Sequence, residues 1–468
     1  MKKMNRMILA SALMMSALVS AQAQNVSPVD FMRMNPYQLK ANPATDLPYE
    51  SVMSLIIGDV SVNLQNTTLR YDNLFDFDAQ GRPAVVNLCK LANSLKTRNY
   101  LGLDVDYNFF YLGRRLKHGL LTYEHNIRAQ ALVNYNDGPF KLLAFGNSAF
   151  VGEDNPAAVN LNVQASLFQE FALGYQWNVN ERLSLGGRAK LLFGVGNVNT
   201  LVADAKLFTD PDSYALRLEE AVAIRTSMPR AVTLKDGVIG GNGGFGVGDL
   251  FRNPGFGIDF GAEYRIDDQF SVVAAVRDLG FMRWSANNIE INSHIEDVGQ
   301  FYDNGGFLFN GMDLEQLGLV FSDLEYQELF LDTLKQYFQL QYDRGASYTT
   351  MLNANFLVRG NYDLDANNRF SGQVQGLFYK GGFRPAVTLA YNGYFYNKLD
   401  VCVTYTMMPN SYDNLGIGIS GRLFKTCNVF LTSNNVLSFL NPMNMSGLNV
   451  QAGIVFVLRP EDKNNEYE

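Results

Sequence analysis

The sequence predicts an all-β protein, namely a transmembrane antiparallel β-barrel of about 14 strands with an N-terminal plug segment and a helical insertion in an outer loop. Three observations predict this class: an export signal, long runs of alternating apolar and polar residues, and connections that sort by length. The composition agrees with it. Apolar residues make up 47% and charged residues only 18% of the 468 residues, and 24 Tyr with 33 Phe favour strands.

Residues 1–23 predict a secretory signal peptide. Lys2, Lys3 and Arg6 form a basic start, an apolar run of 13 residues follows, and Ala21-Gln22-Ala23 supplies the small residues that a signal peptidase recognises. A buried helix is the alternative, but polar residues follow the run at once, and the run is too short to span a bilayer. An exported chain with no later apolar stretch of about 20 residues must be soluble outside the cell or form a membrane barrel.

Alternation favours the membrane barrel. In residues 101–112 every second side chain from Leu101 to Tyr111 is apolar, and similar patterns occur at 182–193, 399–407 and 448–458. A strand of about 9–11 residues, apolar outward and polar inward, can cross a bilayer at a tilt. We expect fourteen strands, at residues 50–65, 100–112, 119–133, 164–177, 182–194, 255–265, 270–283, 347–361, 369–380, 384–396, 399–408, 413–424, 427–435 and 447–458.

The connections between these strands sort by length. Bacterial barrels have short periplasmic turns and longer outer loops, whereas a soluble all-β secreted protein, the alternative fold, has no reason to sort them. The expected tight turns are 113–118, 178–181, 266–269, 362–368, 397–398 and 424–427. The expected long connections, all on the opposite side, are 66–99, 134–163, 195–254, 284–346 and 436–446.

Further segments complete the predicted organisation. Residues 24–49 lack a period and precede the barrel, which spans 50–458; they are expected to coil into the lumen as a plug, with turns at Asn35-Pro36 and Asn42-Pro43. The insertion at 284–346 is expected to contain an amphipathic helix within Asp313 to Leu340, which packs on an outer loop or the barrel rim or else binds a partner. Residues 459–468 form a polar tail.

No catalytic, cofactor or metal site is expected, so the protein is not predicted to be an enzyme. The three histidines lack metal-ligand spacing, and neither HExxH nor GxSxG occurs, although a barrel hydrolase stays an alternative. Gly241 to Gly246 matches GxGxxG but lies in an expected loop at 236–249. The three cysteines are expected as free thiols, and the formal charge of −8 disfavours nucleic acid as a partner.

Charged residues on the polar strand faces are expected to point into the lumen. They could line a water path or bind a ligand, or else only pair with one another or with the plug. The predicted lumen-lining residues are Asp104, Asp106, Arg188, Lys190, Arg277, Arg359 and Arg384.

Two motifs carry a resemblance to a known family. Asn42-Pro43-Ala44 precedes the first strand, and the stretch from Asn253-Pro254-Gly255-Phe256-Gly257 to Arg265 runs on into Arg277-Asp278-Leu279-Gly280-Phe281. With them, the chain resembles a family of uncharacterised outer-membrane barrels that is similar to the long-chain fatty-acid transporter superfamily and to barrel components of type IX secretion. The resemblance implies a 14-stranded barrel with its N-terminal segment in the lumen, and it implies no substrate.

These patterns predict a protein of the outer membrane of a Gram-negative bacterium, in contact with membrane lipid or lipopolysaccharide. The leading functional prediction is a passive channel for small hydrophobic or amphiphilic molecules, which would be its ligands. The alternative is a structural or assembly component that anchors a surface or secretion complex and therefore has a protein partner.

Overall fold

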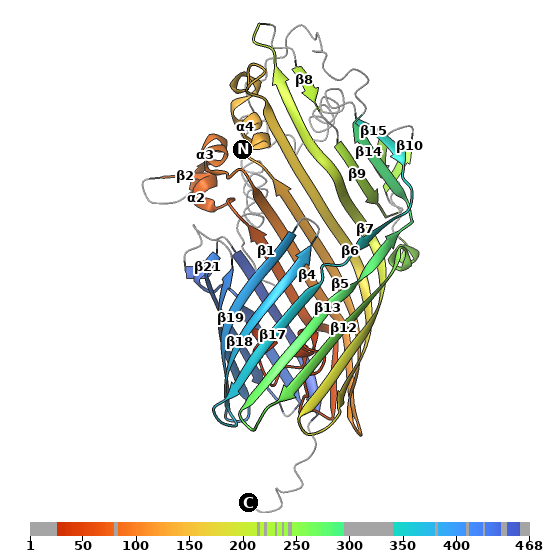
Figure 1. Ribbon diagram of the computed structural model, residues 1–468, viewed down its shortest axis with the longest axis vertical. Helices are drawn as coiled ribbons and strands as arrows, with labels where there is room; N and C mark the ends of the chain where they lie inside the picture. Colours follow the sequence, from red (N-terminus) through yellow and green to blue (C-terminus); the bar gives the residue numbers. More distant parts are fainter. Residues whose placement is uncertain are drawn as a thin grey trace, which may run out of the picture.

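The computed structural model describes residues 26–458 apart from 79–82, 213–215, 220–221, 230–231, 236–237, 242–245, 294–339, 380–381, 409–410, 425 and 441–446. It contains a closed antiparallel barrel of 14 strands (Figure 1). The last strand pairs with the first, so the barrel has no free edge. The predicted barrel and its strand number are confirmed.

The strands follow one another around the barrel in chain order. Two short strands, β16 and β17, both pair with β13 and together occupy one position. The order is β1 (Ser51–Asn66), β4 (Asn99–Leu116), β5 (Gly119–Tyr135), β6 (Ala157–Asn178), β7 (Leu183–Thr209), β12 (Pro254–Arg265), β13 (Phe270–Trp284), β16 (Tyr348–Met351) with β17 (Asn355–Asp363), β18 (Asn368–Tyr379), β19 (Gly382–Phe395), β20 (Leu399–Met408), β21 (Ser411–Arg422), β22 (Cys427–Ser433) and β23 (Gly447–Leu458).

The two faces of the wall differ as the alternation predicts. In β20, Thr404 and Thr406 are buried inside, whereas Val403 and Tyr405 are 37% and 38% exposed. Exposed apolar side chains recur around the outside, including Leu173, Leu191, Phe260, Leu389 and Leu431. A surface of this kind suits lipid, because soluble proteins rarely expose so large an apolar area. None of the helices in the described ranges is long and apolar enough to cross a membrane.

Two strands extend far beyond the barrel, which the sequence did not predict. β6 and β7 continue as a pair above it, from Ala157 opposite Leu207, and β7 then pairs with β8 (Leu216–Glu219) and β9 (Val222–Ser227). β9 pairs with β14 (Asn288–Ser293), and β14 with β15 (Leu340–Arg344), so the expected loops 134–163, 195–254 and 284–346 contain strands (Figure 1). Above the barrel the strands have neither lipid on one face nor a packed lumen on the other. The alternation of apolar and polar residues that predicts a strand is therefore weaker there.

The remaining outer connections carry small elements. They are α2 (Tyr71–Leu74), β2 (Phe75–Phe77), β3 (Pro83–Val86), α3 (Leu88–Ser94), α4 (Gly138–Phe145), η3 (Asn147–Ala149), β10 (Val232–Lys235), β11 (Val238–Gly241), η4 (Val247–Phe251) and α7 (Leu437–Leu440). The expected loop at 236–249 therefore contains β11 and the start of η4. The predicted helix within 313–340, the signal peptide and the polar tail lie outside the described residues, apart from Leu340 in β15.

The sorting of connections by length is only partly right. All connections at the end of the barrel where β23 ends are tight (Figure 1). The opposite end carries the long connections but also two tight ones, since β18 ends at Tyr379 before β19 begins at Gly382, and β20 ends at Met408 before β21 begins at Ser411. The rule therefore holds at one end of the barrel alone.

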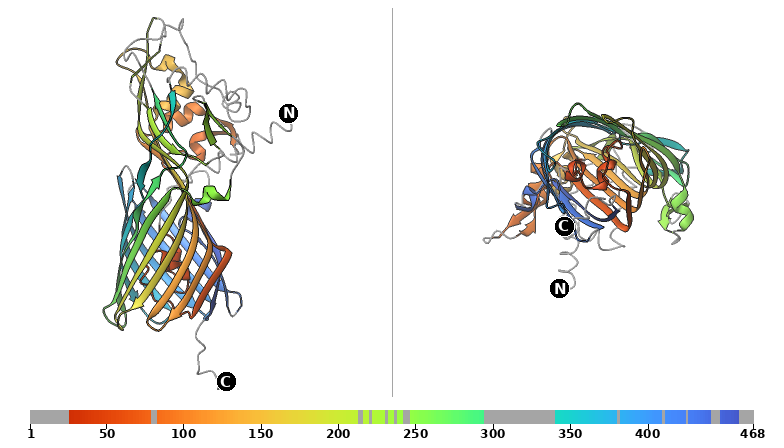
Figure 2. Two further views of the ribbon diagram at one scale, coloured as in Figure 1. Left: turned by 90° about the vertical axis from the view of Figure 1, so that its right-hand side faces the viewer. Right: turned by 90° about the horizontal axis from the view of Figure 1, so that it is seen from below.

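Residues 26–49 lie within the ring of strands, where Figure 2 shows the red segment behind the wall. They form two short 3-10 helices, η1 (Pro28–Phe31) and η2 (Pro36–Lys40), and η1 contacts β19, β20, β21 and β22. Most of their side chains are buried. We call residues 26–49 the N-terminal segment, and it packs against the inner face of the wall beside the site described next.

Candidate functional site

The N-terminal segment begins with two helices that its own side chains cap. The Ser27 hydroxyl accepts a hydrogen bond from the backbone of η1, and the Asn35 Oδ1 accepts one from the Tyr37 N–H at 3.0 Å. Pro36 is the first residue of η2, where its fixed φ suits a helix and its missing N–H costs nothing. Asn35 and Pro36 thus start the second helix.

A second bend rests on two glycines of the wall. The Asn42 Oδ1 accepts a hydrogen bond from the Ala44 N–H at 3.1 Å, which turns the chain at Pro43. Gly186 of β7 and Gly261 of β12 are direct partners in the sheet. A Cβ on Gly186 would lie 2.0 Å from the Pro43 oxygen, and one on Gly261 would lie 2.3 Å from the Asn42 Oδ1. We call this pair of glycines the glycine seat.

Ion pairs join the segment to the wall at two levels. The Lys40 Nζ lies 3.1 Å from Asp59 of β1 and 2.9 Å from Asp106 of β4. Arg33 lies 3.1 Å from Asp363, at the end of β17. These pairs are only partly exposed, so water screens them less than it screens a surface pair.

Two arginines of the wall hold the backbone of the segment. Arg277 donates to the Lys40 carbonyl oxygen at 3.0 Å, and Arg359 donates to the Asp30 carbonyl oxygen at 2.6 Å. The Arg359 guanidinium also lies 4.2 Å from the centre of the Phe31 ring, a cation–π contact. Both contacts need the segment in this conformation, because they engage its main chain.

A second set of charges joins strands of the wall to one another. The Arg188 guanidinium lies 2.9 Å from Glu124 and 3.2 Å from Asp259, and the Lys190 Nζ lies 2.8 Å from Asp259 and 2.7 Å from Asp278. Four of these side chains are buried inside the barrel, and that of Asp278 is 15% exposed. We call this set the charge network.

Arg128 and Glu170 complete the charge network and were not among the residues predicted to line the lumen. Arg128 lies 2.9 Å from Glu170 and 2.9 Å from Asp278. Both residues occupy inward positions of their strands, so the alternation could have found them. Asp278 was harder to place, because it has a φ of 56° and stands where the register of β12 and β13 shifts.

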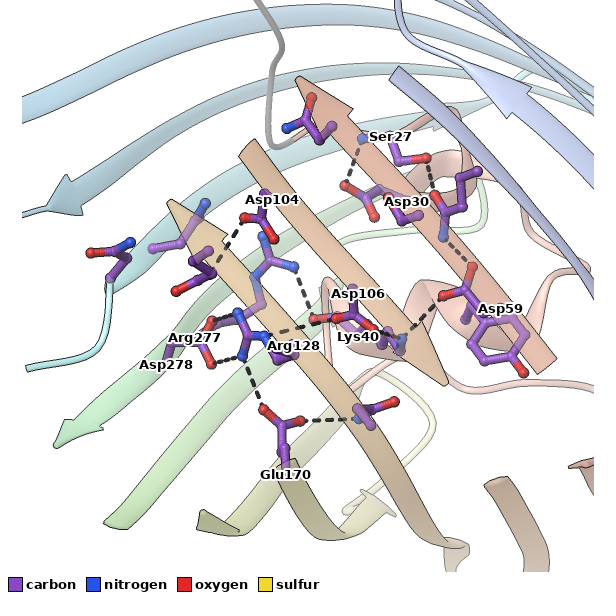
Figure 3. Close-up of a pocket in the computed structure, with 18 of the residues that line it drawn as sticks. Ser27, Asp30, Lys40, Asp59, Asp104, Asp106, Arg128, Glu170, Arg277 and Asp278 are labelled. Carbon is purple, nitrogen blue, oxygen red and sulfur yellow. Dashed lines mark hydrogen bonds and ion pairs between the residues drawn. The ribbon is translucent and has the colours of Figure 1, made fainter. Parts of the chain in front are cut away.

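A polar cavity of about 150 Å³ lies between the N-terminal segment and the wall (Figure 3). Figure 3 shows Asp104, Asp106 and Arg128 from neighbouring strands beside Lys40 of the segment. The other charged residues that line it are Asp30, Asp59, Glu170, Arg188, Lys190, Arg277 and Asp278. A volume of this size holds several waters or a small polar group.

Apolar side chains pack elsewhere between the segment and the wall. The Tyr37 ring lies 5.5 Å from Tyr111 of β4 and 5.6 Å from Phe430 of β22, measured between ring centres. We call the whole group the apolar cluster; it comprises Val26, Val29, Phe31, Met32, Tyr37, Leu39, Leu47, Tyr49, Val52, Tyr111, Leu120, Ala390, Cys402, Phe430, Val455 and Val457.

The wall is irregular in β1, beside this cluster. Ile56 has a φ of 64°, and the register with β4 shifts between Leu55 and Asp59. Ile56 and Ile57 are 53% and 57% exposed on the outside, whereas a Cβ on Gly58 would lie 2.5 Å from the Tyr37 hydroxyl inside. At this bulge the buried Tyr37 hydroxyl packs closely against the inner side of β1. Three consecutive apolar residues in an alternating strand were the signal that could have predicted it.

The structure brings together five of the seven charged residues expected in the lumen, since Asp104, Asp106, Arg188, Lys190 and Arg277 line one cavity. Arg359 lies apart from them against η1. Arg384 is separate again, 4.2 Å from the centre of the Tyr100 ring on β4.

Other chemistry is sparse in the described ranges. No three His, Cys, Asp or Glu side chains group there as metal ligands. Cys89, Cys402 and Cys427 are free thiols.

Comparisons with known proteins give a family and several similar folds. The chain is similar to a monoaromatic hydrocarbon channel, the TodX deltaS2S3 mutant (8% identity, 94% of this chain and 100% of that chain, TM-score 0.46). It is also similar to the Ralstonia pickettii toluene transporter TbuX (9%, 93% and 98%, 0.41) and to a Pseudomonas aeruginosa FadL homologue (10%, 94% and 98%, 0.42). No curated protein matches the chain.

A family model described as a family of unknown function, DUF5723, matches residues 43–434. This range covers most of the barrel, the whole second motif of the predicted resemblance, and Pro43-Ala44 of the first. The expected membership of an uncharacterised family is confirmed, and the chain belongs to the DUF5723 family of unknown function.

Proposed function

We propose that this protein is an outer-membrane channel for small hydrophobic or amphiphilic molecules, which the N-terminal segment closes as a plug until it shifts. The observation that carries the proposal is the apolar cluster. A plug that only sealed a water-filled barrel would need polar contacts alone, yet this segment also covers aromatic and aliphatic side chains of the wall. If the segment moves, those side chains become a surface for apolar solutes.

The charge network makes a straight path through the barrel unfavourable for an apolar molecule. Such a molecule would have to separate buried ion pairs or displace their hydrogen bonds, at a cost of several kcal/mol. The bulge in β1 offers a different exit. It lies beside Tyr37 of the apolar cluster, and its outer face carries Leu55, Ile56 and Ile57. A solute leaving there would pass the hydrogen-bonded Tyr37 hydroxyl, Ser54 and Asn108 and then reach an apolar outer surface without separating an ion pair.

A disulfide that ties the N-terminal segment to the wall and can be reduced again, which we call the lock, tests this function. A Cβ on Gly418 of β21 would lie 2.9 Å from the Pro28 Cβ, close enough for a disulfide after a small shift. We expect a variant with Pro28→Cys and Gly418→Cys, in a background that lacks the three native cysteines, to block uptake of the apolar dye phenylnaphthylamine by intact cells when oxidised. Reduction should restore uptake to the level of the background protein.

The same protein in its two redox states is its own control, and cells with the cysteine-free background show the effect of the reductant alone. Uptake that is equal in both states, with the disulfide verified, would contradict a path opened by the segment. Uptake no higher than in cells without the protein would contradict the channel itself.

The alternative function is an anchor for a surface or secretion complex. The observation that favours it is the sheet above the barrel, where β6, β7, β9, β14 and β15 extend well past the level at which strands such as β18 and β19 end (Figure 1). A partner that copurifies in a fixed ratio from native membranes, together with uptake that the lock leaves unchanged, would support this role over the channel.

A further inference from the structure

The polar cavity holds a carboxylate, that of Asp104, with which no cation of the described residues forms an ion pair. The Asp104 Oδ2 accepts one weak hydrogen bond, from Gln130 at 3.4 Å, and no Lys or Arg nitrogen of the described chain lies within ion-pair distance. Asp106, two residues further along β4, is by contrast 2.9 Å from Lys40. A carboxylate removed from bulk water without a cation is unfavourable, so Asp104 is suited to a positively charged ligand.

The charge balance of the lining points the same way. Six carboxylates line the cavity against five Lys and Arg side chains, which leaves one negative charge in surplus. Asp30 and Arg277 also lack an ion pair among the described residues, but both hold backbone: Asp30 accepts from the Ser27 N–H and Arg277 donates to a carbonyl. The charges of Asp30 and Arg277 have opposite signs and therefore cancel in the count. The other lining carboxylates have ion pairs, so the surplus negative charge is assigned to Asp104.

An independent observation concerns Asn355 of β17, which lines the same cavity. Its side chain is 4% exposed, and neither its Oδ1 nor its Nδ2 has a hydrogen-bond partner. Asn449 of β23 lines the cavity too, is also 4% exposed, and has no partner for its Oδ1. Buried amides almost always form hydrogen bonds to protein, water or ligand, so the two amide oxygens are suited to accept a hydrogen bond from a bound ligand.

The polar cavity and the apolar cluster meet at one residue, Tyr37, which lines the cavity and also belongs to the cluster. A ligand with one small polar end could therefore place that end beside Asp104 and extend an alkyl chain past the tyrosine ring. The volume of about 150 Å³ suits a head group of a few heavy atoms.

We propose that this cavity binds the head group of an amphiphile with a primary ammonium, whose N–H groups donate to Asp104 and to the oxygens of Asn355 or Asn449. Three N–H donors on one charged nitrogen fit this set of acceptors. A carboxylate head group would instead meet the surplus negative charge and be rejected. The inference rests on the proposed channel, since it names the class of amphiphile that the channel selects.

The test compares three probes of equal chain length: hexylammonium, hexanol and hexanoate. Their binding to the purified full chain in lipid nanodiscs at neutral pH is measured by calorimetry, with empty nanodiscs correcting for partition into lipid. We expect hexylammonium to bind at least tenfold more tightly than hexanol, as a hydrogen bond to a charged group allows, and hexanoate to bind more weakly than hexanol.

Asp104→Asn should bring hexylammonium to within about threefold of hexanol, because the amide keeps the shape and loses the charge. The matched control is Asp137→Asn, which removes the same charge from a partly exposed pair with Lys141 of α4, away from the cavity, and should bind as wild type does. Asn355→Leu should weaken binding of hexylammonium without changing the charge. Migration that differs between heated and unheated samples on a detergent gel verifies that each variant is folded.

Equal affinity for hexylammonium and hexanol, or a preference that survives in folded Asp104→Asn, would overturn the inference. The dye uptake described above separates this failure from that of the channel. Redox-dependent uptake without preference for the amine would contradict the head-group site alone. Preference for the amine without such uptake would keep the site and contradict the channel.

Discussion

Replacing Gly186 with alanine should release the N-terminal segment and raise uptake of phenylnaphthylamine several-fold over wild type. The added Cβ would lie 2.0 Å from the Pro43 oxygen and 2.5 Å from the Ala44 nitrogen. Both are backbone atoms held by the turn at Asn42, so they cannot rotate away as the end of a side chain can. The turn must therefore move off the wall, and uptake by intact cells measures the result.

The neighbouring glycine provides a matched control. A Cβ on Gly187 would meet its nearest neighbours, the Asp259 oxygen and the Phe260 Cδ1, at 3.7 Å and 3.9 Å, which are ordinary contacts. Gly187→Ala should therefore behave as wild type. If folded Gly186→Ala takes up no more dye than Gly187→Ala, then the glycine seat does not hold the segment closed.

Removing the central cation of the charge network should strongly destabilise the barrel. The side chains of Arg188, Glu124 and Asp259 are 5%, 1% and 0% exposed. Arg188→Met keeps much of the volume but leaves Glu124 without its closest cation, and Asp259 with Lys190 alone. Breaking a buried pair in this way costs about 3–5 kcal/mol of the free energy of unfolding. Denaturant titration of the purified protein, followed by its heat-modifiable migration, measures the loss.

Arg114→Met is the control for this prediction. Arg114 lies 3.1 Å from Glu50, but the two side chains are 60% and 47% exposed, so the pair contributes about 0–1 kcal/mol. We expect this variant to unfold close to the wild-type midpoint. An Arg188→Met protein as stable as Arg114→Met would mean that the network stabilises neither the wall nor its register.

The barrel could be predicted because lipid outside and a packed lumen inside both act on the same strands. Inward positions such as Thr404 lie against the packed lumen, and outward positions such as Val403 face the membrane side, so period 2 appears in the sequence. The pattern weakens in the upper parts of β6 and β7. The expected start of β6 at 164 was therefore 7 residues later than the observed Ala157, and the expected end of β7 at 194 was 15 residues earlier than the observed Thr209.

The site was less predictable than the fold. Alternation could place Asp104 and Arg188 on inner faces, yet it could not show which charges would meet, because Lys40 comes from a segment without any period. The glycine seat was hidden for a different reason. Gly186 and Gly261 are 75 positions apart, and only the pairing of β7 with β12 brings them under one turn.

Deleting residues 27–44 tests the central claim most directly, because it removes both helices and the turn at Asn42 and leaves the barrel strands intact. The measurement is single-channel conductance in planar bilayers, with heat-modifiable migration showing that the deletion variant is folded. If the N-terminal segment closes the lumen, the variant should conduct well above the wild type. Unchanged conductance in the folded variant would contradict the account, and the anchoring role would then become the leading function.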